Sequence, residues 1–248
     1  MKKRILSGKN REWLEKGRSP FIHRLYESPQ SGPEIEAESF AIIDGEAPPH
    51  EYTPAQWEVV RRMIHTVGDL DIMGAIQFSP DAIAAGIQAL RAGRPIFTDS
   101  NMIRSGISLK RLRTACPEYG PTSLVCPIGE EEIARQATAS GLPRALFAVR
   151  EAKSILQGGL AVFGNAPVGL LELNRLIMVE NIQPALVIAM PVGFVHVIES
   201  KEELISLDIP YIVLAGRRGG SPLAVSVIHA LCTLAEGQKE NDRKGLRP

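Results

Sequence analysis

Short apolar runs and longer helical patterns alternate along this chain. Five runs, each four or five residues long and partly β-branched, predict buried strands at 95–98, 123–126, 160–163, 185–189 and 211–215. Helical patterns separate these runs and predict helices at about 129–140, 143–157, 167–181 and 200–207. This order predicts an α/β fold: a single domain with a mostly parallel sheet, right-handed crossovers and helices on both faces.

Three further helices are marked at their starts by a hydroxyl residue directly before proline: Thr53-Pro54, Ser79-Pro80 and Ser221-Pro222. The hydroxyl caps the first free N–H groups, and proline suits the first helical position. These pairs predict helices over about 54–67, 80–91 and 222–236. Gln56 completes a capping box in the first helix. Gly68 and Gly93 are placed to end the first two helices in the left-handed conformation.

The two ends of the chain lack these patterns. We expect an N-terminal extension over 1–20, an α/β domain over 21–236 and a flexible polar tail over 237–248. The basic N-terminus has no apolar stretch of the kind found in a secretory signal. The most apolar window, 158–178, is interrupted by polar residues and proline, which argues against a membrane span.

Composition narrows the partners and the compartment. Hydrophobic residues make up 44% and charged residues 23% of the 248, which is typical of globular proteins. Lysine and arginine number 28, as do aspartate and glutamate, so no net field favours nucleic acid or an anionic membrane as a partner. Cys116, Cys126 and Cys232 are odd in number and lack metal-binding spacing, which predicts reduced thiols in a cytoplasmic protein.

The loops that follow the predicted strands are the places to look for a site, because ligands of parallel sheets bind beyond the carboxyl ends of the strands. These loops read TDSNMIRSG (98–106), GNAPVG (164–169), MPVGFVHVIES (190–200) and GRRGGSP (216–222). The GRRGGSP loop brings together glycine N–H groups, two arginines and the start of a helix, a combination that suits an anion. The alternative is that the glycines serve only a tight turn with positive φ. The GRRGGSP loop matches neither of the nucleotide-binding motifs GxxxxGK[ST] and GxGxxG, so a nucleotide site is weakly supported. The GNAPVG segment, taken alone, is more often a helix cap than a binding element.

His65 is the candidate for proton chemistry. It lies at the C-terminal end of the helix predicted over 54–67. A lone histidine there is more often structural, because the helix dipole favours its cation, and a functional role is the alternative. The sequence has no HExxH and no GxSxG motif, so neither a metal site nor covalent catalysis is expected.

Five ordered segments together resemble the precorrin-8X methylmutase family. They are RRMIHTVGDLD (61–71), FSPDAIAAGIQALRAGRPIFTDSNMIRSGI (78–107), GNAPVGLLEL (164–173), PALVIAMPVGFVHVIESKEEL (184–204) and GRRGGSPLAV (216–225). The resemblance covers about 22–236 and includes ESFAIID (38–44). It implies a homodimer of α/β subunits with active sites at the dimer interface. The implied activity is an isomerase of cobalamin (vitamin B12) biosynthesis, which converts precorrin-8X or cobalt-precorrin-8 to hydrogenobyrinate or cobyrinate by moving the ring-C methyl group from C11 to C12.

The resemblance also implies roles for individual residues. His65, in MIHT, matches the histidine that the family uses as its acid. The implied substrate-binding residues are Ser39, Thr98, Asp99, Arg104, Ser108, Arg144, Asn165, Ala166, Pro167, Gly193 and Phe194. Many relatives read GxTRS and GNAPTAL where this chain has GLPRA and GNAPVGL, so hydroxyl groups are absent here from two places that the resemblance puts near the substrate.

The implied reaction fits the residues that the sequence offers. A methyl shift between adjacent ring carbons needs no nucleophile, cofactor or metal from the protein, whereas protonation of the ring-C nitrogen assists it. A histidine can supply that proton at neutral pH, and Arg144, Arg104 and the N–H groups of GNAP and GRRGGS would hold the substrate carboxylates. Two alternatives stay open: a non-catalytic tetrapyrrole carrier on the same fold, and a nucleotide-dependent transferase that uses the GRRGGS loop.

Overall fold

The computed structural model describes residues 22–243, with side chains as far as 239. The extension expected over 1–20 and the last residues of the tail, 244–248, lie outside the described residues. The chain divides into two units, one ending at Gly45 and the other beginning at Glu46.

The first unit contains two helices that the sequence patterns above do not predict, α2 (Ile22–Glu27) and α3 (Gly32–Glu46). A capping box starts α3: the Ser31 N–H donates to Glu34 Oε2 at 2.6 Å, and the Glu34 N–H donates to Ser31 Oγ at 3.4 Å. Phe40 and Ile43 are the buried apolar side chains of this helix.

The second unit is built on a sheet with the strand order β1-β6-β5-β4-β2-β3. The strands are β1 (Ile76–Phe78), β2 (Ile96–Thr98), β3 (Leu124–Val125), β4 (Leu160–Phe163), β5 (Leu186–Ala189) and β6 (Tyr211–Leu214). Neighbouring strands are parallel except β1 and β6, which are antiparallel with Ile76 opposite Leu214. The mostly parallel α/β sheet and its five expected strands are therefore confirmed. The edge strand β1 is an addition, because a run of three residues, IQF, is too short to show a strand period.

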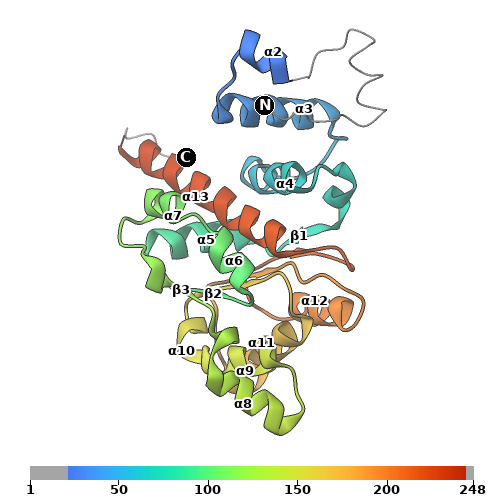
Figure 1. The fold of residues 1–248 in the computed structure, drawn as a ribbon, viewed down its shortest axis with the longest axis vertical. Coiled ribbons are helices and arrows are strands. Elements are labelled where there is room, and N and C mark those ends of the chain that lie inside the picture. The colour runs from blue at the N-terminus through green and yellow to red at the C-terminus, as the bar shows by residue number, and fades with distance from the viewer. Residues whose placement is uncertain (1–21, 244–248) are drawn as a thin grey trace, which may run out of the picture. The chain divides into compact units, whose positions relative to one another are not determined.

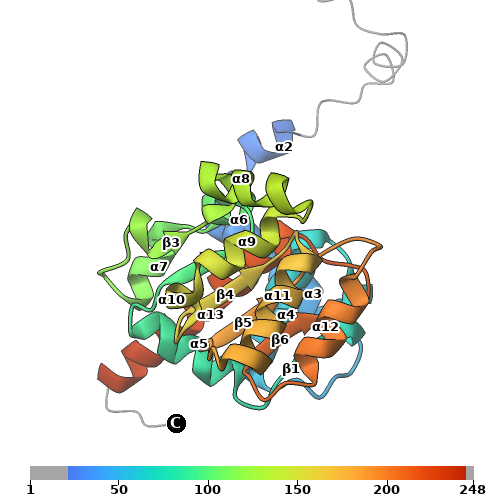
Figure 2. The same cartoon turned by 90° about the horizontal axis from the view of Figure 1, so that it is seen from below.

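Helices lie on both faces of this sheet, as expected (Figures 1 and 2). Helix α13 packs against α4, α5, α6 and α7, and α11 packs against α9 and α12. The helices are α4 (Pro54–Val67), α5 (Ala82–Arg91), α6 (Asn101–Gly106), α7 (Leu109–Ala115), α8 (Glu131–Ser140), α9 (Arg144–Glu151), α10 (Lys153–Leu156), α11 (Pro167–Glu180), α12 (Val197–Ile205) and α13 (Ser221–Arg243). Short 3₁₀ turns are η1 (Leu70–Ala75), η2 (Pro121–Ser123) and η3 (Pro127–Gly129).

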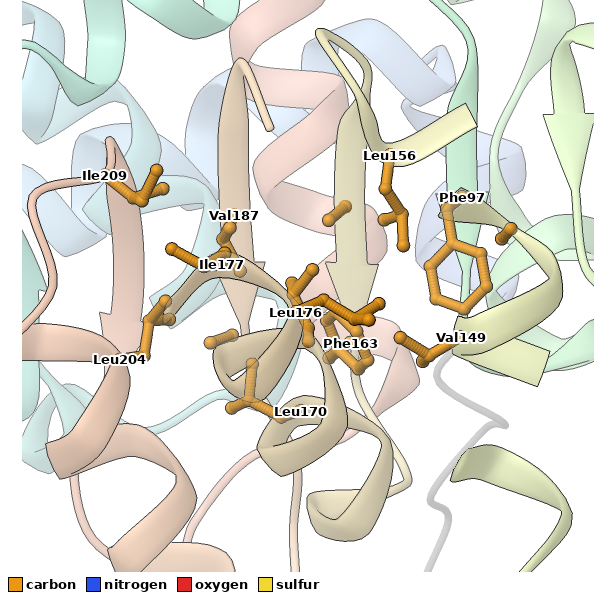
Figure 3. Close-up of a cluster of buried hydrophobic side chains, with 14 of the residues drawn as sticks. Phe97, Val149, Leu156, Phe163, Leu170, Leu176, Ile177, Val187, Leu204 and Ile209 are labelled. Carbon is orange, nitrogen blue, oxygen red and sulfur yellow. The ribbon is translucent and has the colours of Figure 1, made fainter. Parts of the chain in front are cut away.

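The central strands are buried on both faces, which is why they read as continuous apolar runs rather than alternating ones. Figure 3 shows one of the resulting clusters, in which the rings of Phe97 and Phe163 lie with centroids 5.5 Å apart. Leu170, Leu173 and Ile177 recur at helical spacing and bring one face of α11 into this cluster. Each such side chain contributes about 1.5 to 3 kcal/mol by its burial.

The capping pattern at α4 is confirmed. The Gln56 N–H donates to Thr53 Oγ1 at 3.3 Å, the Thr53 N–H donates to Gln56 Oε1 at 3.0 Å, and Gly68 ends the helix with φ of 63°. The helix start predicted at Ser79-Pro80 is wrong. Helix α5 begins at Ala82, and Ser79 Oγ accepts instead from the Tyr211 N–H at 2.9 Å. Ser79 thus extends the hydrogen bonding of β6 rather than capping a helix.

Three helix boundaries differ from the expected ones. The pattern over 143–157 is divided at Ala152, whose ψ of 12° separates α9 from α10. Helix α12 begins at Val197, earlier than expected. Helix α13 continues to Arg243, so residues 237–243 of the expected flexible tail are helical. The polar residues of that segment include good helix formers, and one glycine does not stop the helix.

The described residues contain no helix long and apolar enough to cross a membrane. Cys116, Cys126 and Cys232 are free thiols.

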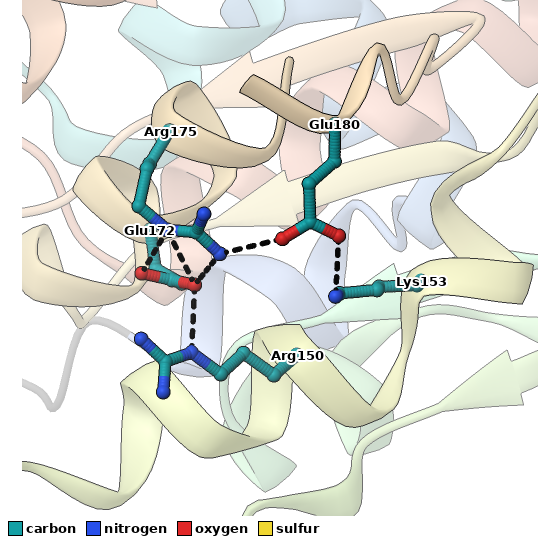
Figure 4. A network of polar contacts seen from close by, with 5 residues as sticks. All are labelled: Arg150, Lys153, Glu172, Arg175 and Glu180. Carbon is teal, nitrogen blue, oxygen red and sulfur yellow. Dashed lines mark hydrogen bonds and ion pairs between the residues drawn. The ribbon is translucent and has the colours of Figure 1, made fainter. Parts of the chain in front are cut away.

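A network of ion pairs joins α9, α10 and α11 (Figure 4). Glu172 is 5% exposed and accepts from Arg150 Nε at 2.8 Å and from Arg175 Nη2 at 2.7 Å. Arg175 and Lys153 also bind Glu180. Burial raises the pKa of Glu172, but hydrogen bonds from Arg175 and Arg150 and their charges outweigh it, so its pKa lies below the ordinary value. The network fixes the helix that starts at Arg144.

We expect Glu172→Gln to lower the free energy of unfolding by about 1 to 3 kcal/mol, since it removes a buried carboxylate that holds two guanidinium groups. The lowered pKa means that this stabilisation is present above the ordinary glutamate pKa and is lost as the pH falls through the lowered one. Urea unfolding at neutral and at acidic pH measures both effects. The difference between wild type and variant should shrink in acid, and Glu151→Gln, an exposed change on α9, is the control.

Candidate active site

The candidate site lies at the carboxyl edge of the parallel strands, where the strand order reverses. The chain leaves β2 for β3 on one side and then returns to β4 on the other side of β2. Such a switch point separates the loops of neighbouring strands and is where ligands of open α/β sheets bind. The loops after β2 and β4 therefore frame the site.

Asp99 ties these two loops together. Its side chain is 4% exposed, and Oδ2 accepts from the N–H groups of Gly164, Asn165 and Ala166 at 3.1, 2.8 and 2.8 Å. Burial raises the pKa of Asp99 even though these three hydrogen bonds oppose the rise. The expectation that the N–H groups of the GNAP segment hold substrate carboxylates is wrong for these three, because Asp99 already occupies them.

Thr98 and Asp99 both face the protein interior. Thr98 is fully buried, and its Oγ1 donates to the Val125 carbonyl at 3.4 Å, between β2 and β3. Their contacts in the structure position the loops, and a direct contact of either with substrate stays a prediction. Asn165 is exposed, and Ala166 and Pro167 are half-buried at the start of α11.

The GRRGGS loop packs closely on the loops beside it. A Cβ at Gly219 would lie 2.2 Å from the Met190 carbonyl oxygen, and a Cβ at Gly164 would lie 2.8 Å from Ser221 Cα. Gly216 and Gly220 have φ of 74° and 127°. The tight turn with positive φ is therefore confirmed, and close backbone approach is a second reason for glycine.

Lys201 anchors this loop from α12. The side chain is 1% exposed, and Nζ donates to the carbonyls of Gly216 and Arg218, each at 2.8 Å. Burial lowers the pKa of Lys201 to about 8. The amine thus holds the backbone that carries both arginines of the loop.

The two arginines of the loop have different partners. The Arg217 guanidinium carbon lies 5.4 Å from the ring centroid of Phe194, which is 83% exposed. Arg218 Nη1 donates to Asp69 Oδ2 at 3.0 Å. Gly193 has φ of 144°, and its N–H donates to the Arg217 carbonyl at 3.2 Å. Gly193 and Phe194 are therefore linked to the GRRGGS loop.

His65 opens onto a cavity of about 350 Å³. Its lining residues come from three helices: Arg62, His65 and Thr66 from α4, Met102 and Gly106 from α6, and Ser221, Pro222, Val225, Ser226 and His229 from α13. The walls combine apolar side chains with a few groups able to bind polar atoms, which is typical of small-molecule sites. The position of His65 on the last turn of α4, directed at this cavity, is the geometry that a proton donor needs.

His229 was missed by the reasoning from sequence. Its Nε2 accepts from the Ser108 N–H at 3.0 Å, so the predicted site residue Ser108 is connected to the cavity through it. A usable signal was present: Ser221, Val225 and His229 recur at intervals of four along one helix and line one face. Arg62 lies three residues before His65, about one helical turn, and lines the same cavity.

Other predicted residues lie elsewhere. Arg104 is exposed and lines a different cavity of about 400 Å³, with Asn101 and Ser105. Arg144 is exposed at the start of α9 and is absent from the lining of the His65 cavity. Ser39 is half-buried on α3, in the first unit. Among the residues that the structure describes, no group of three histidine, cysteine or acidic side chains could hold a metal ion.

Comparison with known proteins identifies the family. The family model described as precorrin-8X methylmutase matches residues 34–234. The chain belongs to the precorrin-8X methylmutase family. A cobalt-precorrin-8 methylmutase from Leptospira interrogans is 42% identical over 218 residues, which cover 84% of this chain and 96% of that protein. A precorrin-8X methylmutase from Pseudomonas aeruginosa is 35% identical over 209 residues, covering 84% and 98%.

A solved structure of this family has the same fold. The crystal structure of precorrin-8X methylmutase from Thermus thermophilus is similar with a TM-score of 0.77 and 42% identity, covering 84% of this chain and 98% of that one. The resemblance inferred from the five sequence segments is thereby confirmed.

Proposed function

We propose that this protein catalyses the methyl shift for which its relatives are named, the isomerisation of precorrin-8X or cobalt-precorrin-8 in cobalamin biosynthesis. The observation that carries this proposal is His65 at the end of α4, lining a cavity with mostly apolar walls in a chain of this family. The relatives described above are named for catalysis, and their names give no support to a carrier function.

His65 is the proposed general acid. Movement of a methyl group between adjacent ring carbons is a sigmatropic shift, in which no covalent bond to the protein forms. A proton on the ring-C nitrogen gives a delocalised cation and favours the rearranged product. His65 donates this proton from the wall of the cavity.

Incubation of the purified protein with metal-free and with cobalt-containing precorrin-8 tests this function. Formation of hydrogenobyrinate from the first, or of cobyrinate from the second, supports it and identifies the natural substrate. Tight binding of both without conversion would instead support the carrier alternative. Three free thiols fit action in the reducing cytoplasm, where we place the enzyme.

Arg144 is the proposed anchor for a substrate carboxylate. We expect Arg144→Ala to weaken product binding by about 1.5 to 3 kcal/mol, the value of a charge-assisted hydrogen bond. A titration that follows the absorbance of the bound product measures the dissociation constant. Arg135→Ala removes a similarly exposed charge, paired with Glu132, and should leave the constant unchanged. Equal affinity of Arg144→Ala and wild type would assign Arg144 to the surface.

The proposed assembly is a homodimer. Large apolar side chains are exposed on the second unit, among them Met102, Phe194 and Val195 at 67%, 83% and 69%. Exposed apolar groups of this size favour a protein interface. Light scattering coupled to size exclusion should give twice the mass of one chain at the concentrations used for assay. A monomer with full activity would contradict the dimer.

A further inference from the structure

His229 is a second imidazole in the cavity of the proposed acid. It lies on α13, half-buried, whereas His65 lies on α4, and these two helices pack against each other. The mechanism proposed above uses one histidine. The contacts of His229 indicate that its role differs from that of His65.

The hydrogen bond to His229 fixes the form of its ring. The Ser108 N–H donates to Nε2 at 3.0 Å, so Nε2 carries a lone pair and the neutral ring carries its proton on Nδ1. Protonation would place a hydrogen on Nε2 facing the hydrogen of the Ser108 amide. The contact therefore exists only while His229 is neutral.

Ser108 lies between α7 and a helix that lines the cavity, α6. It is the N-cap of α7, where its Oγ accepts from the Arg111 N–H at 3.4 Å, and it follows α6 after a single residue. Helix α6 supplies Met102 and Gly106 to the cavity wall. The bond from Ser108 to His229 thus adds to the packing of α6 and α7 against α13.

Charged residues on the helices around His229 carry both signs. Arg62 and His65 line the same cavity from α4, and Arg111 stands on α7, close enough to α13 to affect the Cys232 thiol. Glu236 is the acidic residue on α13 that acts on the same thiol. Protonation of His229 would add a positive charge to the cavity that Arg62 and His65 also line.

We propose that His229 is a positioning residue, which holds the α6 wall of the cavity in place while neutral and releases it when protonated. This inference rests on the function proposed above. It assigns the two limbs of the pH profile to different histidines. Activity falls on the alkaline side as His65 loses the proton to be transferred, and on the acid side as His229 gains a proton and loses Ser108.

Two substitutions separate this role from a merely structural one. His229→Leu cannot accept the Ser108 N–H, and we expect kcat to fall by up to about tenfold at neutral and alkaline pH, as for the loss of one partly buried hydrogen bond, and to match wild type in acid, where His229 has already released Ser108. His229→Gln offers Oε1, at about the position of Nε2, to the same N–H but does not titrate. It should recover most of that loss and show no acid limb, while the alkaline limb remains. His50→Asn, in a histidine stacked on Trp57 in another cavity, should keep both limbs.

Two measurements test the proposal: the pH profile of turnover in each variant, and nitrogen NMR of the histidines in wild type. An acid limb that is the same in wild type and His229→Gln would overturn the proposal. Absence of turnover in wild type would refute the proposed function instead, and NMR then decides the role of His229. A Ser108 amide resonance that shifts as His229 titrates supports the coupling, and one that stays fixed overturns it.

Discussion

Replacement of His65 by alanine should lower the rate of the methyl shift by about 10² to 10⁴-fold, the usual contribution of a positioned general acid. The substitution removes one exposed side chain on the last turn of α4 and leaves the cap at Gly68 in place. Fold and dimer should therefore survive, and product should still bind. Single-turnover measurements, with circular dichroism as a check on folding, test this expectation.

His65→Asn is the sharper control, because asparagine keeps a hydrogen-bond donor of similar reach but has no proton to give. We expect its rate to be close to that of His65→Ala. A rate within about threefold of wild type would mean that hydrogen bonding or enclosure drives the shift, since general acids contribute far more than that. Loss of the alkaline limb in both variants would assign the transferred proton to His65.

Replacement of Asp99 by alanine should be the most destabilising single change at the site, costing more than about 4 kcal/mol, because hydrogen bonds to a carboxylate contribute about 1.5 to 3 kcal/mol each and three are lost. The N–H groups of Gly164, Asn165 and Ala166 would lose their common acceptor. Activity should fall with stability, because the loops after β2 and β4 would no longer be joined.

Asp99→Asn should cost much less, since its amide oxygen can accept from the same N–H groups. Burial raises the pKa of Asp99, so the site disfavours the charge that asparagine lacks. Urea denaturation of the three proteins measures the ranking. If Asp99→Ala proves as stable as wild type, other contacts hold the GNAP segment.

The sheet could be predicted from the sequence because its central strands are buried on both faces and read as uninterrupted apolar runs. Thr53 and Gly68 act within their own helix, so their roles were visible too. Ser79 shows the limit: its hydroxyl binds a backbone 132 residues away, and no local pattern distinguishes that use from a cap. The strand β1 depends in the same way on its pairing with β6.

The site was predictable in its location and its proposed acid, and less so in its polar contacts. The loops after the strands lie where a parallel sheet places them, and His65 lines a cavity there. The GNAP donors, however, are held by Asp99, and a sequence does not say which partner satisfies a donor. His229 reaches the cavity only because α13 packs across α4, which is a tertiary fact.

Lys201 anchors the backbone of the GRRGGS loop by hydrogen bonds that do not require its positive charge. Two carbonyls need two donors, which a neutral amine also supplies, with weaker hydrogen bonds than those of an ammonium group. With its pKa lowered to about 8, Lys201 loses its proton in mildly alkaline solution and still retains both anchors. The electrostatic potential at the loop then weakens while the backbone geometry persists. Arg217 and Arg218 stay positively charged throughout. The attraction of the GRRGGS loop for anions therefore decreases as Lys201 loses its proton, but it does not disappear.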